Sequence, residues 1–300
     1  MTRYPVKVGE RHLELSNLDK VLWPDKGITK GDLIHYYASV AERLLPHLRR
    51  RPLTLTRYPD GITGDMFYQK DTPLHAPDWL PTYAVASSIP GRMVRYLLAE
   101  EAAALVWLAN QATIEIHPWM STVEHPAYPD YAVIDLDPAE GATWADVVEI
   151  ARLVRVLLER LDLVGFPKLS GATGIHIYVP LAARYSFAQT SQFVGFLGRL
   201  LVKAYPEKAT NERLVQCRNG RVYIDHLQNL PGKTIVAPYV PRPVAGAPVS
   251  VPVSWAELGE VTPEQFSVDQ PQLILKRPKD HDAMYSLQQS LDAVLPLLNL

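Results

Sequence analysis

Two aspartates separated by a single residue, Asp135 and Asp137, are the side chains of this sequence best suited to chemistry. They close a short apolar run at residues 131–137, which predicts a buried strand, and residues two apart in a strand project from one face. Carboxylates held this close repel each other unless a cation lies between them, and Mg²⁺ and Mn²⁺ prefer oxygen ligands. Pro138 follows at once and would place the acids at a strand end, where sites in α/β sheets form. The pattern alone also fits glycosyltransferases, nucleases and plain surface acids.

A third carboxylate, Asp225, closes another apolar segment 88 residues after Asp137. An isolated aspartate in such a place usually forms a turn. Two-metal phosphoryl transfer nevertheless needs a third acid, because two carboxylates rarely hold both ions. Lys233 and Arg242 follow, and their positive charges could neutralise a triphosphate as charge moves onto the leaving pyrophosphate.

Between these acids, residues 170–178 (SGATGIHIY) combine a hydroxyl, two glycines and a histidine. Glycines in a tight turn allow backbone N–H groups to approach a phosphate closely. His176 follows in an alternating strand, on the face opposite to Ile175 and Ile177. A histidine buried for purely structural reasons explains this position equally well.

The composition allows one large or two small packed domains, because 47% of the 300 residues are hydrophobic. No run of 18 apolar residues and no apolar N-terminal region occurs, so the sequence predicts neither a membrane span nor secretion. The single cysteine, Cys217, excludes an internal disulfide framework and a cysteine-based zinc site. We therefore expect a soluble, cytoplasmic protein.

The net charge of -2 does not indicate a nucleic-acid-binding protein, but the charges are unevenly distributed. Residues 1–60 contain 11 Lys and Arg against 7 Asp and Glu, and residues 199–242 contain 8 against 3. A basic groove on an otherwise neutral protein is compatible with phosphate binding. An ordinary solvated surface explains the same numbers.

The elements that must position these residues follow a mixed α/β order. Helices are predicted at residues 29–48, 97–109, 143–163 and 187–205, the first and third with a Thr/Asp pair at their start. Strands are predicted at residues 112–117, 131–137, 166–170, 175–179, 221–225 and 234–237, with a turn at 231–232. An aperiodic, proline-containing stretch at residues 118–130 indicates a break. Residues 238–252 are rich in proline, and two or three short helices after them would wrap around the body.

Taken in order, these motifs resemble the primase-polymerase domain of bacterial non-homologous end-joining ligase D. The matching motifs are NLDKVLWP at residues 17–24, TKGD at 29–32, DLDP at 135–138, SGATGIHIY at 170–178, and IDHLQN with KTIVAPY within 224–239. The resemblance runs from about residue 10 to the end, so we expect the whole chain to be one such domain.

The resemblance implies an α/β (α+β) fold of the archaeo-eukaryotic primase type. Mixed central sheets would be flanked by helices and would include an RRM-like catalytic core. Within this single domain we expect an N-terminal α/β module at residues 1–117 and a catalytic core with the acidic triad at residues 130–245. A C-terminal helical extension would follow at residues 246–300.

By this resemblance, the three aspartates are the catalytic metal ligands and hold two Mn²⁺ or Mg²⁺ ions: Asp135, Asp137 and Asp225. The resemblance also assigns contacts with the incoming nucleotide to Ser170, His176, Lys233, Arg242, His117 and Gln228. The role of Gln228 is the least defined of these, and His117 could equally serve to cap the turn at Pro118.

On the DNA side, the resemblance implies that Lys20 and Lys30 bind the 5′-phosphate of gapped or broken DNA. Lysine acts as a point charge, which suits a terminal phosphate dianion. Phe67 and Tyr68 would stack on template bases, where each stacked base contributes roughly 1–3 kcal/mol. Solvated lysines and a buried aromatic pair are the alternatives.

Arg57 and Lys70 flank the aromatic pair and could contact the DNA backbone. The sequence departs from the family at Tyr68, where phenylalanine is common, and at His226, where many relatives carry an aromatic residue. The stretch before Asp225 also holds few lysines, which leaves three arginines as candidates: Arg213, Arg218 and Arg221.

The function implied by the resemblance is template-dependent nucleotidyl transfer, which fills gaps and extends ends during double-strand break repair by end joining. The enzyme would use NTP or dNTP, prefer ribonucleotides and work best with manganese. No K-x-D-G ligase motif and no histidine-rich phosphoesterase domain is recognisable. We therefore expect a stand-alone polymerase or an excised domain that acts near the nucleoid, with Ku and a DNA ligase in trans.

Two other classes of function remain open at this point. A metal-dependent nucleotide-sugar glycosyltransferase could use Asp135 and Asp137 but would not require Asp225. A non-catalytic DNA-end-bridging module could use Lys20, Lys30 and Phe67 alone, without any of the three acids.

Overall fold

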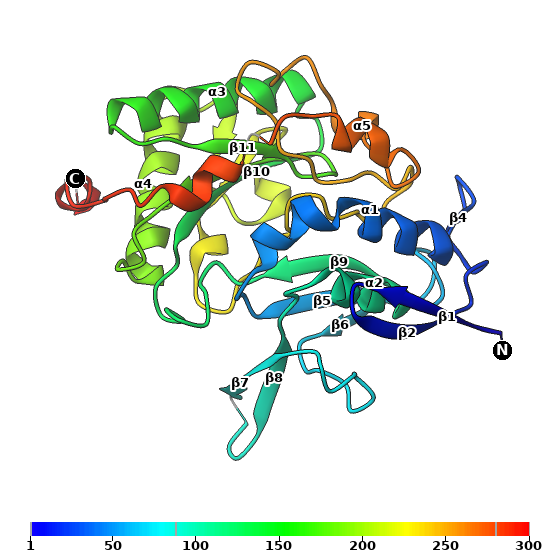
Figure 1. The fold of residues 1–300 in the computed structure, drawn as a ribbon. Coiled ribbons are helices and arrows are strands. Elements are labelled where there is room, and N and C mark those ends of the chain that lie inside the picture. The colour runs from blue at the N-terminus through cyan, green and yellow to red at the C-terminus, as the bar shows by residue number, and fades with distance from the viewer. Residues whose placement is uncertain (1, 88, 280, 300) are drawn as a thin grey trace. The chain divides into compact units, whose positions relative to one another are not determined.

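The computed structural model describes residues 2–87, 89–279 and 281–299, which divide into two compact units (Figure 1). The first unit comprises Met1–Trp119, Thr234–Val251 and Glu264–Pro278, and the second comprises Met120–Lys233, Pro252–Pro263 and Lys279–Leu300. The first division falls inside the stretch where the sequence predicts a break. Residues 234–245, expected in the catalytic core, belong to the first unit, and the expected C-terminal extension is shared between both.

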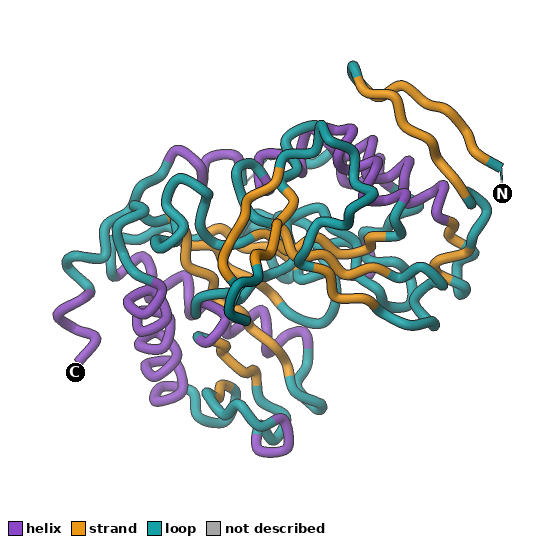
Figure 2. Tube along the Cα trace, turned by 90° about the horizontal axis from the view of Figure 1, so that it is seen from below, coloured by secondary structure: helices purple, strands orange, loops and turns teal. Residues whose placement is uncertain are grey.

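Short antiparallel strands dominate the first unit. Two hairpins come first, β1 (Arg3–Val8) with β2 (Arg11–Ser16), visible as a long ribbon in Figure 2, and β3 (Val21–Trp23) with β4 (Ile28–Thr29). A three-stranded sheet has the order β6 (Phe67–Gln69), β5 (Leu53–Arg57), β9 (Thr113–Pro118). A further hairpin, β7 (Thr82–Ala86) with β8 (Met93–Leu97), projects from this sheet in Figure 1. None of these strands except β9 was predicted.

Helix α1 (Lys30–Leu48) begins where the sequence predicts. The Thr29 hydroxyl accepts the Asp32 N–H, and the Asp32 carboxylate accepts the Thr29 N–H, so two of the unsatisfied donors at the helix start are paired. The apolar stripe of α1 is fully buried, including Tyr36 and Tyr37. It packs against α2 (Ala102–Asn110), and α5 (Pro271–Leu275) contacts α1 as well.

The helix predicted at residues 97–109 is wrong in its first part. Leu97 is the last residue of β8, paired with Thr82, and helix α2 begins only at Ala102. The strand predicted at residues 234–237 is also wrong, because only Thr234 makes an isolated bridge, to Trp119. Both segments are apolar, and their conformations are decided by the partners that they meet in the fold rather than by their own pattern.

A five-stranded sheet forms the centre of the second unit. Its order is β11 (Phe166–Leu169), β12 (Ile175–Pro180), β10 (Tyr131–Pro138), β14 (Val222–Asp225) and β13 (Ala209–Thr210). All pairs are antiparallel except β13 with β14. The four longer strands agree with the predicted ones to within one residue at each end.

One face of this sheet is apolar and is covered by two helices, α3 (Trp144–Arg160) and α4 (Phe187–Ala204). Ile134, Leu136 and Ile177 project from this face and are completely buried. Both helices start with capping boxes, formed by Thr143 with Asp146 in α3 and by Ser186 with Gln189 in α4. Because strand side chains alternate, Asp135, Asp137 and His176 must lie on the opposite face.

The C-terminal segment covers part of that opposite face. The buried His281 ring packs edge-on against Phe166 and Tyr178, and its Nε2 donates to the Pro167 carbonyl at 2.8 Å. Burial lowers the pKa of His281 to about 4, so the ring is neutral near pH 7.

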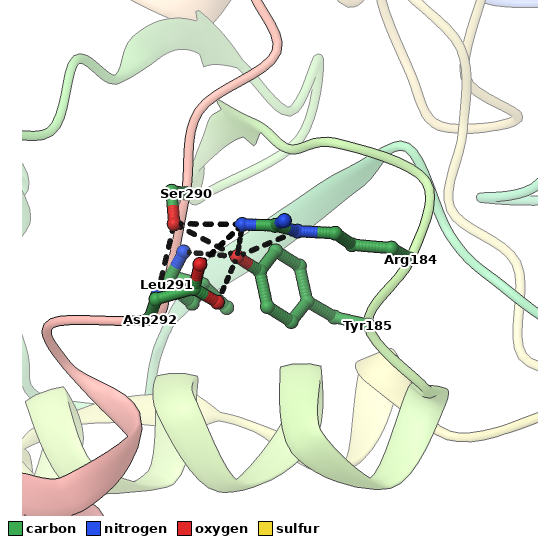
Figure 3. Close-up of polar contacts among 5 residues, drawn as sticks. All are labelled: Arg184, Tyr185, Ser290, Leu291 and Asp292. Carbon is green, nitrogen blue, oxygen red and sulfur yellow. Dashed lines mark hydrogen bonds and ion pairs between the residues drawn. The ribbon is translucent and has the colours of Figure 1, made fainter.

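A cluster of hydrogen bonds connects a later part of the C-terminal segment, at residues 290–292, with Arg184 and Tyr185 (Figure 3). The buried Tyr185 hydroxyl donates to Asp292 at 2.8 Å and accepts the Leu291 N–H and the Arg184 guanidinium. Together with the turns at Asp282–Ser286 and Leu295–Asn299, these contacts make the last described residues part of the second unit.

Candidate active site

A row of polar residues crosses the face of the five-stranded sheet that lies opposite to α3 and α4. Asp135 in β10 is the direct cross-strand partner of His176 in β12 and of Asp225 in β14. Lys168 in β11 is in turn the partner of His176. Directly opposed residues share a face, with Cβ atoms roughly 4.5–5.5 Å apart. The strand register therefore places Asp225 beside Asp135, as the predicted triad requires, and Asp137 follows two residues along the same strand.

Each acid of the triad has identifiable partners. His176 Nε2 lies 3.4 Å from Asp135 Oδ1. Asp225 Oδ1 accepts the Leu227 N–H at 2.9 Å and the Tyr223 hydroxyl at 3.2 Å. Burial, together with the negative charge of Asp225, raises the pKa of Tyr223 to about 12, so this hydroxyl stays protonated and remains a donor.

Arg218 binds the remaining acid. Its guanidinium donates to Asp137 Oδ2 at 2.7 Å and stacks on the Tyr223 ring, 4.0 Å from the ring centre. The arginine side chain is almost entirely buried, whereas Asp137 is about half exposed. Arg218 was considered only as one of three basic candidates near Asp225, and the structure places it directly on the acidic site.

The donor set suits a hard divalent cation, since it consists of three carboxylates on one face of two paired strands. Within the described residues, however, no three His, Cys, Asp or Glu side chains are arranged as a ready-made metal site. One oxygen of Asp137, Oδ2, accepts a hydrogen bond from Arg218. Metal binding by all three acids would therefore involve a carboxylate that already has a cationic partner.

The turn before β12 is organised by Ser170, which is buried. Its hydroxyl accepts the N–H groups of Ala172 and Gly174 at 3.1 and 3.0 Å, and its own N–H donates to the Gly174 carbonyl. Gly171 has a positive φ of 76°, which favours glycine. Ser170 thus holds the turn in shape, and its predicted contact with the nucleotide remains a prediction.

Downstream of Asp225, Gln228 lies half-buried in the turn Leu227–Asn229, and Lys233 is exposed. Their assignment to the nucleotide also remains a prediction. The next residue in the motif, Asn229, is completely buried, and its amide pairs with both the N–H and the carbonyl of Val133 at 2.8 and 2.7 Å. Asn229 therefore ties the loop after β14 to the strand that carries two of the acids.

The first unit holds the other predicted nucleotide contacts, His117 and Arg242. Both are paired with Glu115, which the sequence analysis did not single out. His117 Nε2 lies 3.4 Å from Glu115 Oε2, and Arg242 Nε donates to Glu115 Oε1 at 2.8 Å. Burial opposes ionisation of Glu115, but the interactions with these two partners outweigh it and lower its pKa to about 2.

The β3–β4 hairpin brings Lys20 and Lys30 together, because the Lys30 N–H donates to the Lys20 carbonyl at 2.8 Å. Lys20 is partly exposed and pairs with Asp60 at 2.5 Å. Lys30 is the first residue of α1 and only 4% exposed, and its ammonium donates to the Asn110 carbonyl and side chain, each at 3.1 Å. A role of the pair in binding DNA remains a prediction.

Phe67 and Tyr68 are 54% and 55% exposed, so the alternative of a buried aromatic pair is wrong. Successive residues of β6 project to opposite faces. Arg57 is the cross-strand partner of Phe67 and donates to Gln69, whereas Lys70 lies 5.6 Å above the Tyr68 ring. Each aromatic ring therefore has one basic residue close to it, and stacking on template bases remains a prediction.

Comparison with known proteins identifies the family. A model of the family described as "LigD, primase-polymerase domain" matches residues 29–282 of this chain. The chain belongs to the LigD primase-polymerase family. Its members are nucleotidyltransferases, and the mixed α+β fold agrees with that family.

Curated relatives and a solved structure support the assignment. The chain is 36% identical over 296 residues to the multifunctional end-joining DNA repair protein LigD of Mycobacterium tuberculosis, which covers 96% of this chain and 38% of the relative. It is 34% identical over 259 residues to the bifunctional LigD of Bacillus subtilis, covering 86% and 41%. The polymerase domain of the M. tuberculosis ligase D, solved in complex with DNA, has a TM-score of 0.85 and 34% identity, covering 92% of this chain and 99% of that one.

The chain thus spans about two fifths of the length of these LigD proteins. Membership of the primase-polymerase family removes the glycosyltransferase alternative. Among the described residues, none of the helices combines the length and the hydropathy that a bilayer-crossing segment requires.

The structure shows three residues of this LigD-type domain that sequence reasoning did not assign: Glu115, Tyr223 and Asn229. A signal existed for the first two. Glu115 stands two residues before His117, and Tyr223 two residues before Asp225, so each shares a strand face with an assigned residue. Asn229 had no such signal, because its partner Val133 is 96 residues away.

A pH dependence tests the predicted contact between Lys30 and the 5′-phosphate. Burial, and next the positive charge of Lys20, lower the pKa of Lys30 from 10.5 to about 8. Above pH 8 the unbound lysine loses its proton, and binding a phosphate dianion then requires proton uptake. The ratio of affinities for 5′-phosphorylated and 5′-hydroxyl gapped DNA should fall up to about tenfold per pH unit above 8.

Equilibrium DNA binding between pH 7 and 9.5 measures this ratio. The Lys30→Met variant is the control, in which the ratio should be low and nearly independent of pH over the same range. A wild-type ratio that stays constant up to pH 9.5 would show that Lys30 does not bind the 5′-phosphate and serves only as a hydrogen-bond donor to Asn110.

Proposed function

We propose that this chain is a template-directed polymerase that adds nucleotides to the 3′ end of DNA at gaps and broken ends during end joining. The observation that carries the proposal is the strand register, which places Asp135 and Asp225 opposite each other with His176 on the other side of Asp135. Family membership makes nucleotidyl transfer the reaction class, and the related polymerase domain in complex with DNA supports DNA as the substrate.

In this proposal the sheet face that carries Asp135, Asp137 and Asp225 is the reaction centre. Asp135, Asp137 and Asp225 would hold two Mg²⁺ or Mn²⁺ ions, which supply activation of the primer 3′-hydroxyl and neutralisation of the triphosphate. His176, next to Asp135, offers a polar group on the same face for the triphosphate. Tyr223 keeps the Asp225 carboxylate in place, because its hydroxyl remains protonated and donates to it.

The positively charged residues assigned to the nucleotide, Lys233 and Arg242, would stabilise charge that moves onto the pyrophosphate. His117 would contact the same nucleotide. Ser170 would act through the shape of its turn, which its hydroxyl holds by accepting the N–H groups of Ala172 and Gly174. Gln228 is assigned to the same nucleotide.

DNA would be recognised by the first unit. Lys20 and Lys30 would bind a 5′-phosphate, while the exposed rings of Phe67 and Tyr68 would stack on template bases. Arg57 and Lys70 would contact the backbone. We further propose a preference for ribonucleotides and manganese, a cytoplasmic location near the nucleoid, and cooperation with Ku and a DNA ligase.

Primer extension on a gapped duplex tests this function. Each reaction pairs one variable with its control: rNTP with dNTP, Mn²⁺ with Mg²⁺, and 5′-phosphate with 5′-hydroxyl on the downstream strand. We expect templated incorporation that is faster with rNTP, with Mn²⁺ and with the 5′-phosphate. Absence of incorporation under every condition would refute the polymerase. If 5′-phosphorylated gapped DNA still bound tightly in that case, the chain would be an end-bridging module.

A further inference from the structure

A buried charge cluster in the first unit is centred on Glu115, in the middle of strand β9. The side chain alternates with Ile114 and Ile116, which are fully buried on the other face, and it shares its own face with His117. Only 7% of Glu115 is exposed. A carboxylate so far from water costs several kcal/mol unless cations or donors compensate for the lost hydration.

Arg242, from a distant part of the chain, and His117, on the same strand, provide this compensation. Arg242 Nε donates to Oε1 at 2.8 Å, and His117 Nε2 lies 3.4 Å from Oε2. The two carboxylate oxygens are thus used separately, one for each partner. Arg242 donates to Glu115 through Nε, and this contact restricts the orientation of its guanidinium.

The phenols of Tyr37 and Tyr58 also interact with Glu115. The negative charge of Glu115 raises the pKa of both, in addition to the larger effect of burial. Both phenols stay neutral near pH 7 as a result. The Tyr37 hydroxyl donates to the Ile114 carbonyl at 2.7 Å. The cluster therefore contains one buried anion between His117 and Arg242.

We propose that Glu115 is a positioning residue for nucleotide binding, which holds His117 and Arg242 in the orientations in which they receive the triphosphate. The inference rests on the proposed function, because it takes the incoming nucleotide as the ligand of these two residues. A carboxylate that orients a histidine and an arginine at once reduces the conformational freedom that would otherwise be lost when the ligand binds.

A purely structural role of Glu115 predicts a different result for its substitution. If the acid served only to neutralise a buried arginine, its loss would lower the stability of the protein without a selective effect on the nucleotide. The isosteric Glu115→Gln variant separates the two roles, because it keeps the volume and one acceptor oxygen while removing the charge.

The first measurement is nucleotide affinity by equilibrium binding of a labelled ATP, which does not depend on turnover. Glu115→Gln is expected to weaken binding about tenfold, which corresponds to the loss of one charge-assisted pair. The shorter Glu115→Asp variant retains the charge and should recover part of the affinity. In primer extension the KM for the nucleotide should rise by a similar factor, with kcat changed less than about threefold.

A matched control exists in the same unit. Glu101 accepts a hydrogen bond from Arg11 Nε at 2.9 Å, an ion pair of the same type as that between Glu115 and Arg242. Glu101→Gln should leave nucleotide affinity and KM unchanged. Binding of gapped DNA should be unchanged in both variants, and thermal unfolding confirms that each is folded.

The decisive comparison is between the effect of Glu115→Gln in the wild-type chain and its effect in a chain that lacks the Arg242 side chain. In an Arg242→Ala background, Glu115→Gln should weaken nucleotide binding by clearly less than tenfold, because one of the two groups that it positions is gone. Full additivity of the two changes, or unaltered ATP affinity of the single Glu115→Gln variant, would overturn the positioning role. Failure of the wild-type chain to extend a primer would instead count against the proposed function, since ATP binding is measured independently.

Discussion

The Asp225→Asn variant is expected to lose nucleotide addition by about a thousandfold while keeping its fold. Asparagine retains the Oδ1 acceptor that binds the Leu227 N–H and the Tyr223 hydroxyl, so the end of β14 should be undisturbed. What disappears is the negative charge directly opposite Asp135. Stabilisation of the reaction by metal ions amounts to several kcal/mol, and each 1.36 kcal/mol corresponds to about a factor of ten in rate.

Single-turnover primer extension on gapped DNA measures this loss, and thermal unfolding checks the fold. Asp162→Asn is the matched control in the same unit, because Asp162 is exposed and has a positive φ of 56° that asparagine also tolerates. The control should extend primers at the wild-type rate. If Asp225→Asn did so as well, Asp225 would not be a metal ligand and the proposed mechanism would be wrong.

The acids illustrate what the sequence could predict about the site. A strand that ends in Asp135 and Asp137 is recognisable from its apolar run and its spacing of two. That Asp225 lies opposite Asp135 depends on the register between β10 and β14, which are connected by 83 residues. Register is set by which side chains the two faces bury, so it could be read only from the structure.

Charge partners were harder to predict than the acids themselves. Arg218 reaches Asp137 across 81 residues of sequence, and Arg242 reaches Glu115 across 127. Nothing local distinguishes these arginines from solvated ones. For nucleotide contacts, sequence and resemblance indicated His117 and Arg242, whereas the carboxylate that joins them became evident only from its position between the two.

The fold was predicted best where local signals are strongest. The Thr/Asp capping boxes of helices α1 and α3 are recognisable in the sequence, and both helices start where they were predicted to within one residue. The small sheets of the first unit were mostly missed, because two- to six-residue strands lack a distinctive period. Residues 97–101 (LLAEE) are all good helix formers, but Leu97 pairs with Thr82 in a hairpin. Tertiary pairing overrides intrinsic preference in such short segments.

The Gly174→Ala variant is expected to lower the stability of the second unit and to impair nucleotide addition together. A Cβ atom at this position would collide with the Leu136 carbonyl oxygen and lie 3.3 Å from its carbon. Gly174 does not have a positive φ, so close packing of two backbones, and not backbone conformation, is what requires glycine here. Leu136 is the residue between the two acids, so relief of the collision must move either the acids or the turn that begins at Ser170.

The expected cost is about 2–3 kcal/mol, the upper part of the range for inserting atoms into a well-packed site. For a chain of this size it corresponds to a fall in Tm of roughly 5–10 °C. Gly195→Ala in α4 is the matched control. Its nearest neighbour would be the His226 ring at 3.4 Å, an ordinary contact, and alanine favours a helix over glycine by about 1 kcal/mol. Calorimetry should therefore show a lower Tm for Gly174→Ala and an equal or higher Tm for Gly195→Ala.

Primer extension by the folded Gly174→Ala variant then distinguishes an effect on the reaction from an effect on stability alone. At a temperature where Gly174→Ala is still folded, primer extension should remain at least tenfold below wild type, because the Ser170–Gly174 hydrogen bonds and the His176–Asp135 pair share this junction between β12 and β10. If the folded variant instead extended primers normally, the geometry of the turn would be unimportant for the reaction. Glycine at this position would then serve only to let two strands meet.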